Sequence, residues 1–174
     1  AMLNMDRAEN VEEFQQALRP WHVPTFAMVI ADVDGSIGLQ STGRIPIRSE
    51  LERGYRPGWD PDHQWQGLIP FESMPAIQNP DHDWIATANN RLAPNNYPYK
   101  LFGCWSSGWR AQRIREMIES RSQHSVNDMR TMQQDVKSLR AAELIPVLLP
   151  HLQNHSEERV RKASAALGKW DCCS

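Results

Sequence analysis

The sequence lacks several features that would assign it at once to a functional class. Its 174 residues include only three cysteines, Cys104, Cys172 and Cys173. An odd number with two adjacent members fits neither a disulfide framework nor spaced pairs of zinc ligands, so we expect free thiols. No apolar run is long enough to cross a bilayer, and no charged segment followed by an apolar one precedes the first helix. We therefore expect no membrane partner, and the sequence indicates no compartment.

A large excess of charge of either sign is also lacking. The sequence contains 19 Lys and Arg residues and 21 Asp and Glu residues, which gives a formal net charge of −2. Such a chain offers no basic field for phosphates, so we expect no nucleic-acid partner. Neither a phosphate-binding glycine loop nor a Ser-x-x-Lys pattern occurs, and we expect no cofactor. With 40% hydrophobic residues, the chain is long enough for one domain with a core.

The best-defined local structure is a helix followed by a hairpin. Asn10 and Glu13 form a capping pair that predicts a short amphipathic helix. Residues 26–33 are rich in apolar and β-branched side chains and predict a strand. Asp34-Gly35 is typical of a two-residue hairpin turn, which predicts a return strand over 36–42. Pro46 has no N–H to donate, so we expect strand pairing to end there.

From residue 49 to residue 102 the chain loses periodicity and is rich in Pro, Gly and Trp, which excludes long helices. Residues 84–88 are the best remaining strand candidate. A loop of this length usually carries function or packs on another element. We expect it to be held by its aromatic side chains, Trp59, Trp65, Trp84, Tyr97 and Phe102. A sugar- or acyl-binding wall is the alternative role for these aromatics, and burial of the loop is favoured.

The remainder of the chain is predicted to be helical. One helix is expected over 109–120, and Ser125 opens another with an S-x-x-D cap. Pro146 predicts a kink or restart in the apolar segment that follows. Ser156 predicts the cap of a last helix. The expected buried stripe of the second helix comprises Val126, Met129, Met132, Val136 and Leu139.

Two groups of acidic residues and histidine could suggest a metal site. They are Asp60, Asp62 and His63, and Asp81, His82 and Asp83. Each group lies in a polar loop beside a proline, without the helical or strand spacing that would aim ligands at one ion. We therefore expect no metal site.

Several motifs occur in an order that resembles a known family. They are ADVDGSIG at 31–38 and STGRIPIR at 41–48, followed by PGW, QWQGLIPF, DWIATANNR and WRAQRI. The chain resembles the β-chain of the penicillin amidase (penicillin acylase) family, within the N-terminal nucleophile hydrolases, from about residue 11 to 171. The resemblance implies an α+β fold: a hairpin and short strands from an αββα sandwich, a long ordered loop region and a mainly helical C-terminal half. Its parts would be 11–48, 49–105 and 106–171.

The resemblance also implies an activity. The family, typically periplasmic or secreted, hydrolyses amides of acylated amines, such as antibiotics or acyl-homoserine lactones, with an N-terminal serine whose own amine acts as base. This chain begins Ala1-Met2, so we expect it to lack the nucleophile and to be inactive alone. Its partners would be the remaining segments of the same precursor and a small amide substrate. The bond between Gly35 and Ser36 resembles the family's cleavage site, but a turn is the favoured interpretation.

Two residues correspond to the family's active-site region. In the family, an asparagine five residues before the first aspartate of ADVDG donates a hydrogen bond to the oxyanion. That aspartate is Asp32 here, and Ala27 takes the place of the asparagine. Loss of such a donor costs about 100- to 1000-fold in rate. The parent is thus a weak enzyme, one with another donor, or a non-catalytic scaffold or binding module. Arg48, which closes G-x-x-P-x-R, is expected either in the substrate pocket or in a structural ion pair. The resemblance carries over no calcium ligand.

Overall fold

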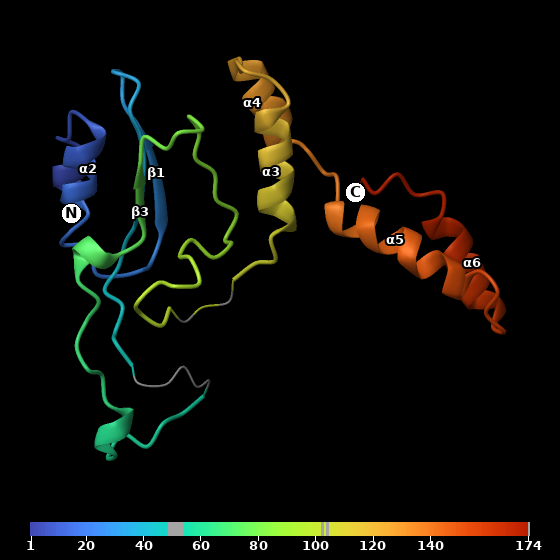
Figure 1. Cartoon of the computed structure of the whole chain (residues 1–174), viewed down its shortest axis with the longest axis horizontal. Coiled ribbons are helices and arrows are strands. Elements are labelled where there is room, and N and C mark those ends of the chain that lie inside the picture. Colours follow the sequence, from blue (N-terminus) through green and yellow to red (C-terminus); the bar gives the residue numbers. More distant parts are fainter. Residues whose placement is uncertain (49–53, 102, 104, 174) are drawn as a thin grey trace. The chain divides into compact units, whose positions relative to one another are not determined.

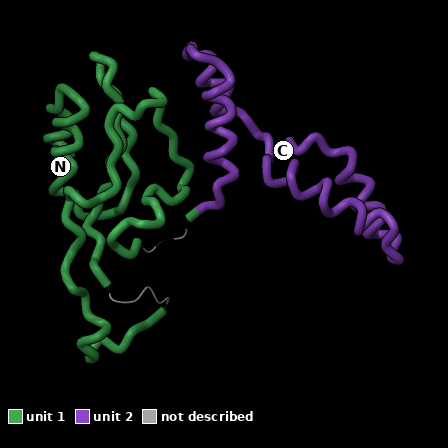
Figure 2. Tube along the Cα trace, viewed as in Figure 1, with its two compact units in different colours: residues 1–105 green, residues 106–174 purple. Residues whose placement is uncertain are grey.

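The computed structural model describes residues 1–48, 54–101, 103 and 105–173. The chain divides into two compact units, Ala1–Trp105 and Ser106–Ser174 (Figure 2). Among their described residues, the first unit, here the sheet unit, holds two α-helices, two short 3-10 helices and a small antiparallel sheet, whereas the second, the helical unit, holds four α-helices. Among the described residues, no helix combines the length and apolarity that a bilayer span requires.

The predicted first helix is present and is fixed by its cap. After the short α1 (Met2–Met5), α2 spans Val11–Ala17. The Asn10 side chain accepts a hydrogen bond from the Glu13 amide at 2.9 Å, which confirms the predicted capping pair. Val11 and Leu18 are each only 1% exposed, so this helix supplies much of the core of the sheet unit.

The predicted hairpin is also present, but with shorter strands and a wider turn. β1 spans Ala27–Ala31 and β2 spans Ile37–Ser41, with Ala31 opposite Ile37. The Asp32 amide then donates to the Ser36 carbonyl at 3.0 Å. The prediction of a two-residue Asp34-Gly35 turn was therefore wrong. Asp32 draws the connection into a wider loop with its side chain, as described below.

The third strand lies in a segment for which no strand was predicted. β3 spans Ala76–Gln78 and pairs antiparallel with β2, in the sheet order β1-β2-β3. All three of its residues are exposed, so no apolar alternation marks it. The strand expected over 84–88 is irregular backbone instead. Pairing to β2, not side-chain pattern, therefore defines this strand.

One face of the sheet packs against α2 (Figure 1). A Cβ added to Gly38 of β2 would lie 2.5 Å from Cγ1 of Val11, so only glycine permits this approach. The buried Gln15 side chain donates to the backbone carbonyl of Leu39 at 3.2 Å. Leu39 itself is 1% exposed. The lack of a side chain at Gly38 and the hydrogen bond from Gln15 thus hold α2 close to the sheet.

The aromatics of the long loop do not act as one group. Trp59 and Trp65 are 87% and 63% exposed, so the expectation that they bury the loop was wrong. Trp84 and Tyr97 are half-buried, and the Tyr97 hydroxyl donates to the Ser73 carbonyl at 2.6 Å. Two further residues discussed above, Phe102 and Cys104, lie outside the described residues.

The helical unit begins as expected and then departs from the prediction. The expected helix over 109–120 is α3 (Trp109–Glu119), and α4 (Val126–Gln133) follows from the predicted Ser125 cap. α5 (Leu139–Leu152) continues through Pro146, so no restart occurs at that proline. The restart comes earlier, at Ser138, whose side chain accepts from the Ala141 amide. α6 (Glu158–Leu167) is preceded by Glu157 as its cap residue, not by Ser156.

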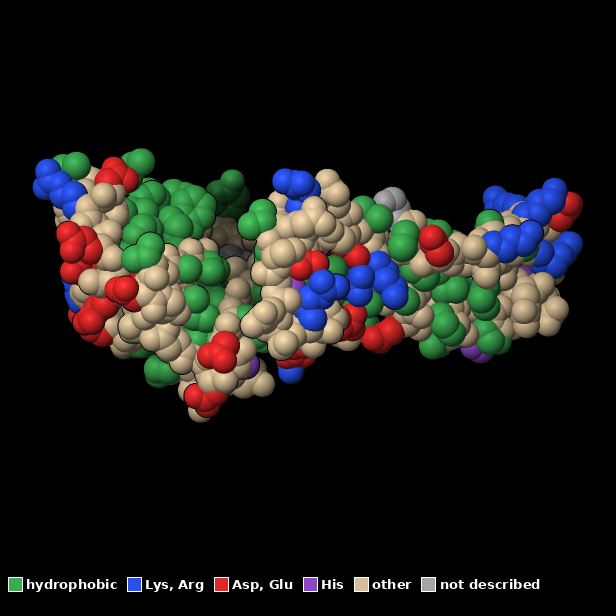
Figure 3. Space-filling model, turned by 90° about the horizontal axis from the view of Figure 1, so that it is seen from above, with side chains coloured by type: hydrophobic (Ala, Val, Ile, Leu, Met, Phe, Trp, Pro, Cys, Tyr) green, Lys and Arg blue, Asp and Glu red, His purple; other side chains and the backbone are tan. Residues whose placement is uncertain are grey.

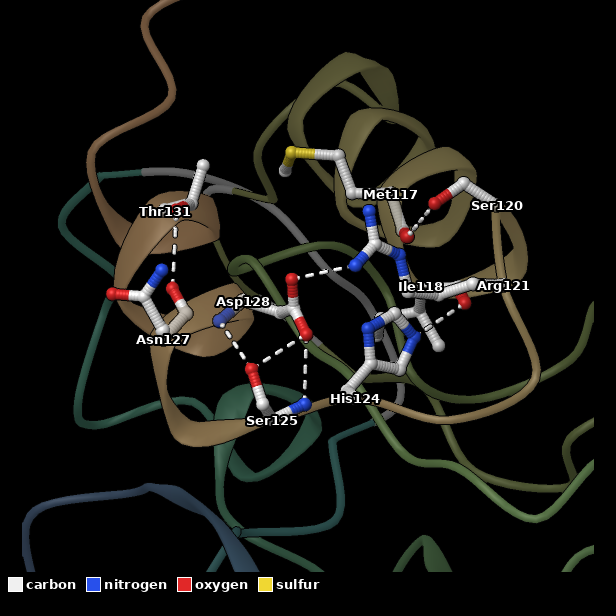
Figure 4. Close-up of polar contacts among 9 residues, drawn as sticks. All are labelled: Met117, Ile118, Ser120, Arg121, His124, Ser125, Asn127, Asp128 and Thr131. Carbon is white, nitrogen blue, oxygen red and sulfur yellow. Dashed lines mark hydrogen bonds and ion pairs between the residues drawn. The ribbon is translucent and has the colours of Figure 1, made fainter.

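The connection from α3 to α4 is held by a group of polar contacts (Figure 4). Ser125 and Asp128 bond each other reciprocally, with the Asp128 carboxylate accepting from the Ser125 amide at 2.8 Å. These bonds, and Arg121 at 2.6 Å, lower the pKa of the Asp128 carboxyl. His124 donates from Nε2 to the Ile118 carbonyl at 2.7 Å. The turn is therefore locally determined.

Apolar side chains of the helical unit face solvent. Val126, Met129 and Val136 are 80%, 44% and 52% exposed, so the prediction that their stripe is buried was wrong. Val147 of α5 is 63% exposed. Figure 3 shows hydrophobic side chains at the surface of this unit, with Lys and Arg gathered over α6. The stripe correctly indicates a helix over its first part, but α4 ends at Gln133, so Val136 lies outside it and Leu139 begins α5.

Candidate functional site

Ala27 begins β1 on the face of the sheet that points away from α2. Gly38 faces Val11 of α2, and Ile30 lies opposite Gly38 in the sheet register. Because side chains alternate along a strand, Ala27 and Val29 project from the other face. Ala27 is half-buried and Val29 is 52% exposed. A longer side chain at position 27 would therefore reach toward partly open space.

Asp32, at the end of the same strand, is a structural anchor that the sequence reasoning missed. One carboxylate oxygen accepts from the Val11 amide at 3.2 Å, at the start of α2. The other accepts from the amides of Asp34 and Ser36 at 3.1 and 2.9 Å. This carboxylate thus joins the hairpin turn to α2, close in sequence to Ala27. A D-x-D-G-S run suggests a turn, but nothing in it indicates the contact with Val11.

The Gly35-Ser36 bond lies in this turn. Gly35 has a φ of +90°, which favours glycine, and the Ser36 amide is bonded to Asp32. Cleavage at this bond would separate two strands that pair over their full length. The bond has the hydrogen bonding of a turn.

Arg48 is positioned by a second pair of extended segments. The Ile47 amide donates to the Gly67 carbonyl at 2.9 Å, and the Gln66 amide returns a bond to Ile47. Pro46 itself forms a bridge with Leu68, so the prediction that pairing ends at this proline was wrong. It lacks a donor, but its neighbours on either side supply the bonds.

The two segments place the Arg48 guanidinium over an aromatic ring. Its central carbon lies 5.8 Å from the centroid of the Trp65 ring, and Arg48 is half-buried. A guanidinium at this distance is attracted by the face of the ring. The indole remains 63% exposed. Arg48 and Trp65 therefore form a cationic and aromatic surface.

The two groups considered as metal ligands have other roles in the structure. Asp60 caps a short 3-10 helix (Pro61–His63) by accepting from the Asp62 amide at 3.0 Å. The His82 ring packs edge-on against Trp84, with centroids 4.7 Å apart. Within the described ranges, no three His, Cys, Asp or Glu side chains gather in a way that could hold an ion.

Of the aromatic residues considered for a binding wall, Tyr97 is the most constrained. Its hydroxyl donates to Ser73, and burial raises the pKa of that hydroxyl above its ordinary value. Its ring lies against Tyr99 at 5.8 Å between centroids. These contacts tie the loop to the segment before β3. In contrast, Trp59 and Trp65 leave most of their surface to solvent.

Comparison with known proteins agrees with the motifs. A family model described as penicillin amidase matches residues 1–173. Over 139 residues the chain is 34% identical to penicillin acylase 2 proenzyme of Pseudomonas sp. (strain SE83), an alignment that covers 79% of this chain and 18% of that protein. It is 36% identical over 145 residues to acyl-homoserine lactone acylase QuiP of Pseudomonas fluorescens, covering 83% of this chain and 18% of that protein.

A solved structure gives the same indication for the fold. Thermostable penicillin G acylase from Alcaligenes faecalis matches 98% of this chain and 31% of its own, with a TM-score of 0.72 and 22% sequence identity. The mixture of helices with a small antiparallel sheet is therefore similar to that fold. The chain spans about 18% of the length of the two curated relatives named above.

Proposed function

Because this chain belongs to the penicillin amidase family, we propose that it is one portion of a larger hydrolase that cleaves the amide bond of an acylated amine. The observation that carries this proposal is the family match over nearly the whole chain, together with relatives named as penicillin and acyl-homoserine lactone acylases. The substrate would be an antibiotic or an acyl-homoserine lactone. Residues 27–48 would contribute a hairpin to an αββα sandwich, and the other segments of the protein would be the partners of this chain.

The catalytic groups of the proposed enzyme lie largely outside this chain, which alone is expected to be inactive. Its share of the relatives' length leaves room for a nucleophile elsewhere. Ala27 would lie near the reacting carbonyl, but its methyl group cannot donate a hydrogen bond. The expected cost of a missing donor is about 100- to 1000-fold in rate. Arg48, held over Trp65, would form part of the pocket wall and bind the substrate.

A non-catalytic scaffold or binding module is the second candidate, and Ala27 is the observation that favours it. A protein that keeps the hairpin and the Asp32 anchor, but no donor at position 27, could retain the shape of the family without its chemistry. The two candidates differ in one measurable property, which is turnover by the full-length protein.

The test is an assay of the full-length protein with a chromogenic phenylacetyl amide and with an N-acyl-homoserine lactone. Turnover above the buffer blank supports the hydrolase, whereas binding of either compound without turnover supports the binding module. Ala27→Asn should raise turnover by about 100-fold or more if the methyl group occupies the position of a donor. Ala31→Asn, on the same strand and face, is the matched control and should leave turnover unchanged.

A further inference from the structure

Ser41, the last residue of β2, lies directly across the hairpin from Ala27. Residues that lie opposite each other in an antiparallel pair project from the same face of the sheet. Because Ala27 projects from the face that points away from α2, Ser41 does so too. Both residues are half-buried. A hydroxyl group therefore lies beside the methyl group of Ala27.

The hydrogen-bond pattern of the hairpin brings these two side chains close together. Next to this pair, the Thr42 amide donates to the Phe26 carbonyl at 2.9 Å. Hydrogen-bonded and non-hydrogen-bonded pairs alternate along an antiparallel ladder, so Ala27 and Ser41 form a non-hydrogen-bonded pair. The Cα atoms of such a pair are about 4.5 Å apart, closer than those of a hydrogen-bonded pair. A ligand atom that approaches position 27 thus comes within reach of the Ser41 hydroxyl.

The backbone of Ser41 is fixed, whereas its hydroxyl is available to a ligand. The Ser41 amide donates to the Pro75 carbonyl at 2.9 Å. Its carbonyl accepts from the buried side-chain amide of Gln40, also at 2.9 Å. The hydroxyl itself has no hydrogen-bond partner within the described ranges. A serine hydroxyl is both a donor and an acceptor, so this one can donate without giving up another bond.

Ser41 is also the one polar side chain that the strands β1, β2 and β3 place on this face. The register of the sheet puts apolar residues at the other positions of the face, namely Ala27, Val29, Ala31, Ile37, Leu39 and Ile77. A hydrogen bond in apolar surroundings is electrostatically stronger than one in water. The Ser41 hydroxyl can therefore supply a directional contact that the neighbouring strand side chains cannot.

We propose that Ser41 is a catalytic residue of the hydrolase and donates the hydrogen bond that Ala27 cannot supply. This rests on the proposed function, which puts position 27 near the reacting carbonyl. When the nucleophile bonds to the carbonyl carbon, the π electron pair of the C=O bond moves to the oxygen, which becomes an oxyanion. The Ser41 hydroxyl donates to this oxygen and keeps its own proton. It accelerates the reaction because it binds the oxyanion more strongly than the neutral carbonyl.

Steady-state kinetics of the full-length protein test this role, with the phenylacetyl amide or the N-acyl-homoserine lactone that it turns over. Ser41→Ala should lower kcat by about 100-fold and change KM by less than about threefold, because the lost bond forms mainly with the oxyanion. Ser41→Thr keeps a hydroxyl and suits a strand, so kcat should stay within about tenfold. Ser36→Ala, at the far end of the hairpin, is the matched control and should leave both constants unchanged.

The outcomes separate this role from the proposed function. An unchanged kcat for Ser41→Ala would overturn the role of Ser41 and leave the hydrolase in place. A rise in KM without a fall in kcat would also overturn it, because the hydroxyl would then bind the substrate and its transition state equally. A lower Tm for Ser41→Ala would identify a structural role instead. Absence of turnover by the unsubstituted protein would overturn the proposed function and this role together.

A double substitution provides a second test. Two donors that bind the same oxyanion are coupled, so the effect of adding one depends on whether the other is present. Ala27→Asn should therefore raise kcat by a factor that is about tenfold larger in the Ser41→Ala background than in the unsubstituted protein. Equal factors in the two backgrounds would show that positions 27 and 41 do not act on the same atom, and would overturn the proposal.

Discussion

Gly38 of β2 and Val11 of α2 lie so close together that there is no room for a Cβ at position 38. A Cβ at position 38 would lie 2.5 Å from Cγ1 of Val11, a distance that real contacts do not reach. Gly38→Ala should destabilise the protein by about 1–3 kcal/mol, because the core is overpacked. Urea unfolding measures the effect.

The same contact predicts coupling between the two positions. Val11→Ala in the Gly38→Ala background should recover part of the loss, since the truncated side chain vacates the space that the new Cβ needs. Gly58→Ala is the matched control, because nothing lies within 4 Å of a Cβ there. Purely additive losses at positions 38 and 11 would contradict the close contact.

Asp32 should be worth more to stability than any other acidic residue of the hairpin. Its carboxylate accepts from three amides, including that of Val11. Asp32→Ala should cost about 2 kcal/mol and Asp32→Asn, which keeps one acceptor oxygen, should cost less. Asp34→Ala is the control, because Asp34 contributes its backbone amide to these bonds, and the substitution keeps that amide. Equal midpoints of thermal unfolding for the Asp32 and Asp34 variants would argue against the anchor.

Asp135 predicts a specific acid dependence of stability. Its side chain accepts two bonds from Arg113, at 2.9 and 2.7 Å, and these bonds lower the pKa of its carboxyl. A lowered pKa in the folded state stabilises fully above the unfolded pKa of about 3.9, and the contribution is lost as the pH falls through the lower folded pKa. Asp135→Asn should therefore destabilise at neutral pH, and the difference from the unsubstituted protein should shrink below about pH 4.

The control for this acid dependence is a more exposed pair. Arg115 and Glu119 form an ion pair in which the side chains are 63% and 44% exposed, against 24% and 19% for Arg113 and Asp135. Glu119→Gln should change stability by less than about 1 kcal/mol at neutral pH. A constant difference between Asp135→Asn and the unsubstituted protein from pH 7 to pH 2 would be inconsistent with the pKa shift.

Arg48 should separate substrate binding from stability in the full-length protein. If its guanidinium is part of the pocket wall, Arg48→Ala should raise KM by roughly tenfold, equivalent to about 1.4 kcal/mol, with little change in Tm. Arg48→Lys should restore less than full binding, because an ammonium lacks the planar face that lies over Trp65. Arg44→Ala, an exposed neighbour, is the control. A fall in Tm without a change in KM would instead identify a structural ion pair or stacking contact.

Local hydrogen bonding explains which elements could be predicted from the sequence. Asn10 and Ser125 cap their helices through residues three positions away, so a short window contains the whole signal. The hairpin was also predicted, because its two strands adjoin in sequence. Its exact turn was not, because the Asp32 carboxylate accepts from the Asp34 and Ser36 amides within a wider connection. The bond of Asp32 to Val11, 21 residues distant, has no local signal either.

Elements that depend on distant partners could not be predicted in this way. β3 is exposed on every residue and exists because its backbone pairs with β2. Residues 84–88 have the composition of a strand but do not form one in the structure. α5 continues through Pro146, although proline has no N–H for the helical hydrogen bond. Composition therefore identified a candidate strand, whereas backbone pairing with β2 determined where the third strand forms.

The residues of the candidate site were predicted on a different basis from the helices and strands. No periodicity or spacing distinguishes Ala27 from the other small residues, and only the order of motifs marks it. Arg48 was likewise identified by its motif, and the contact of its guanidinium with Trp65, 17 positions away, was not foreseeable. Their assigned roles remain predictions until the full-length protein is assayed.

Val126, Val136 and Val147 each leave half or more of their surface to water. Exposed apolar side chains favour the association of a polypeptide with copies of itself. A preparation of these 174 residues by themselves should thus become turbid or oligomeric as it is concentrated. Mild detergent should clear it and a thiol reductant should not, because the association would involve no sulfur.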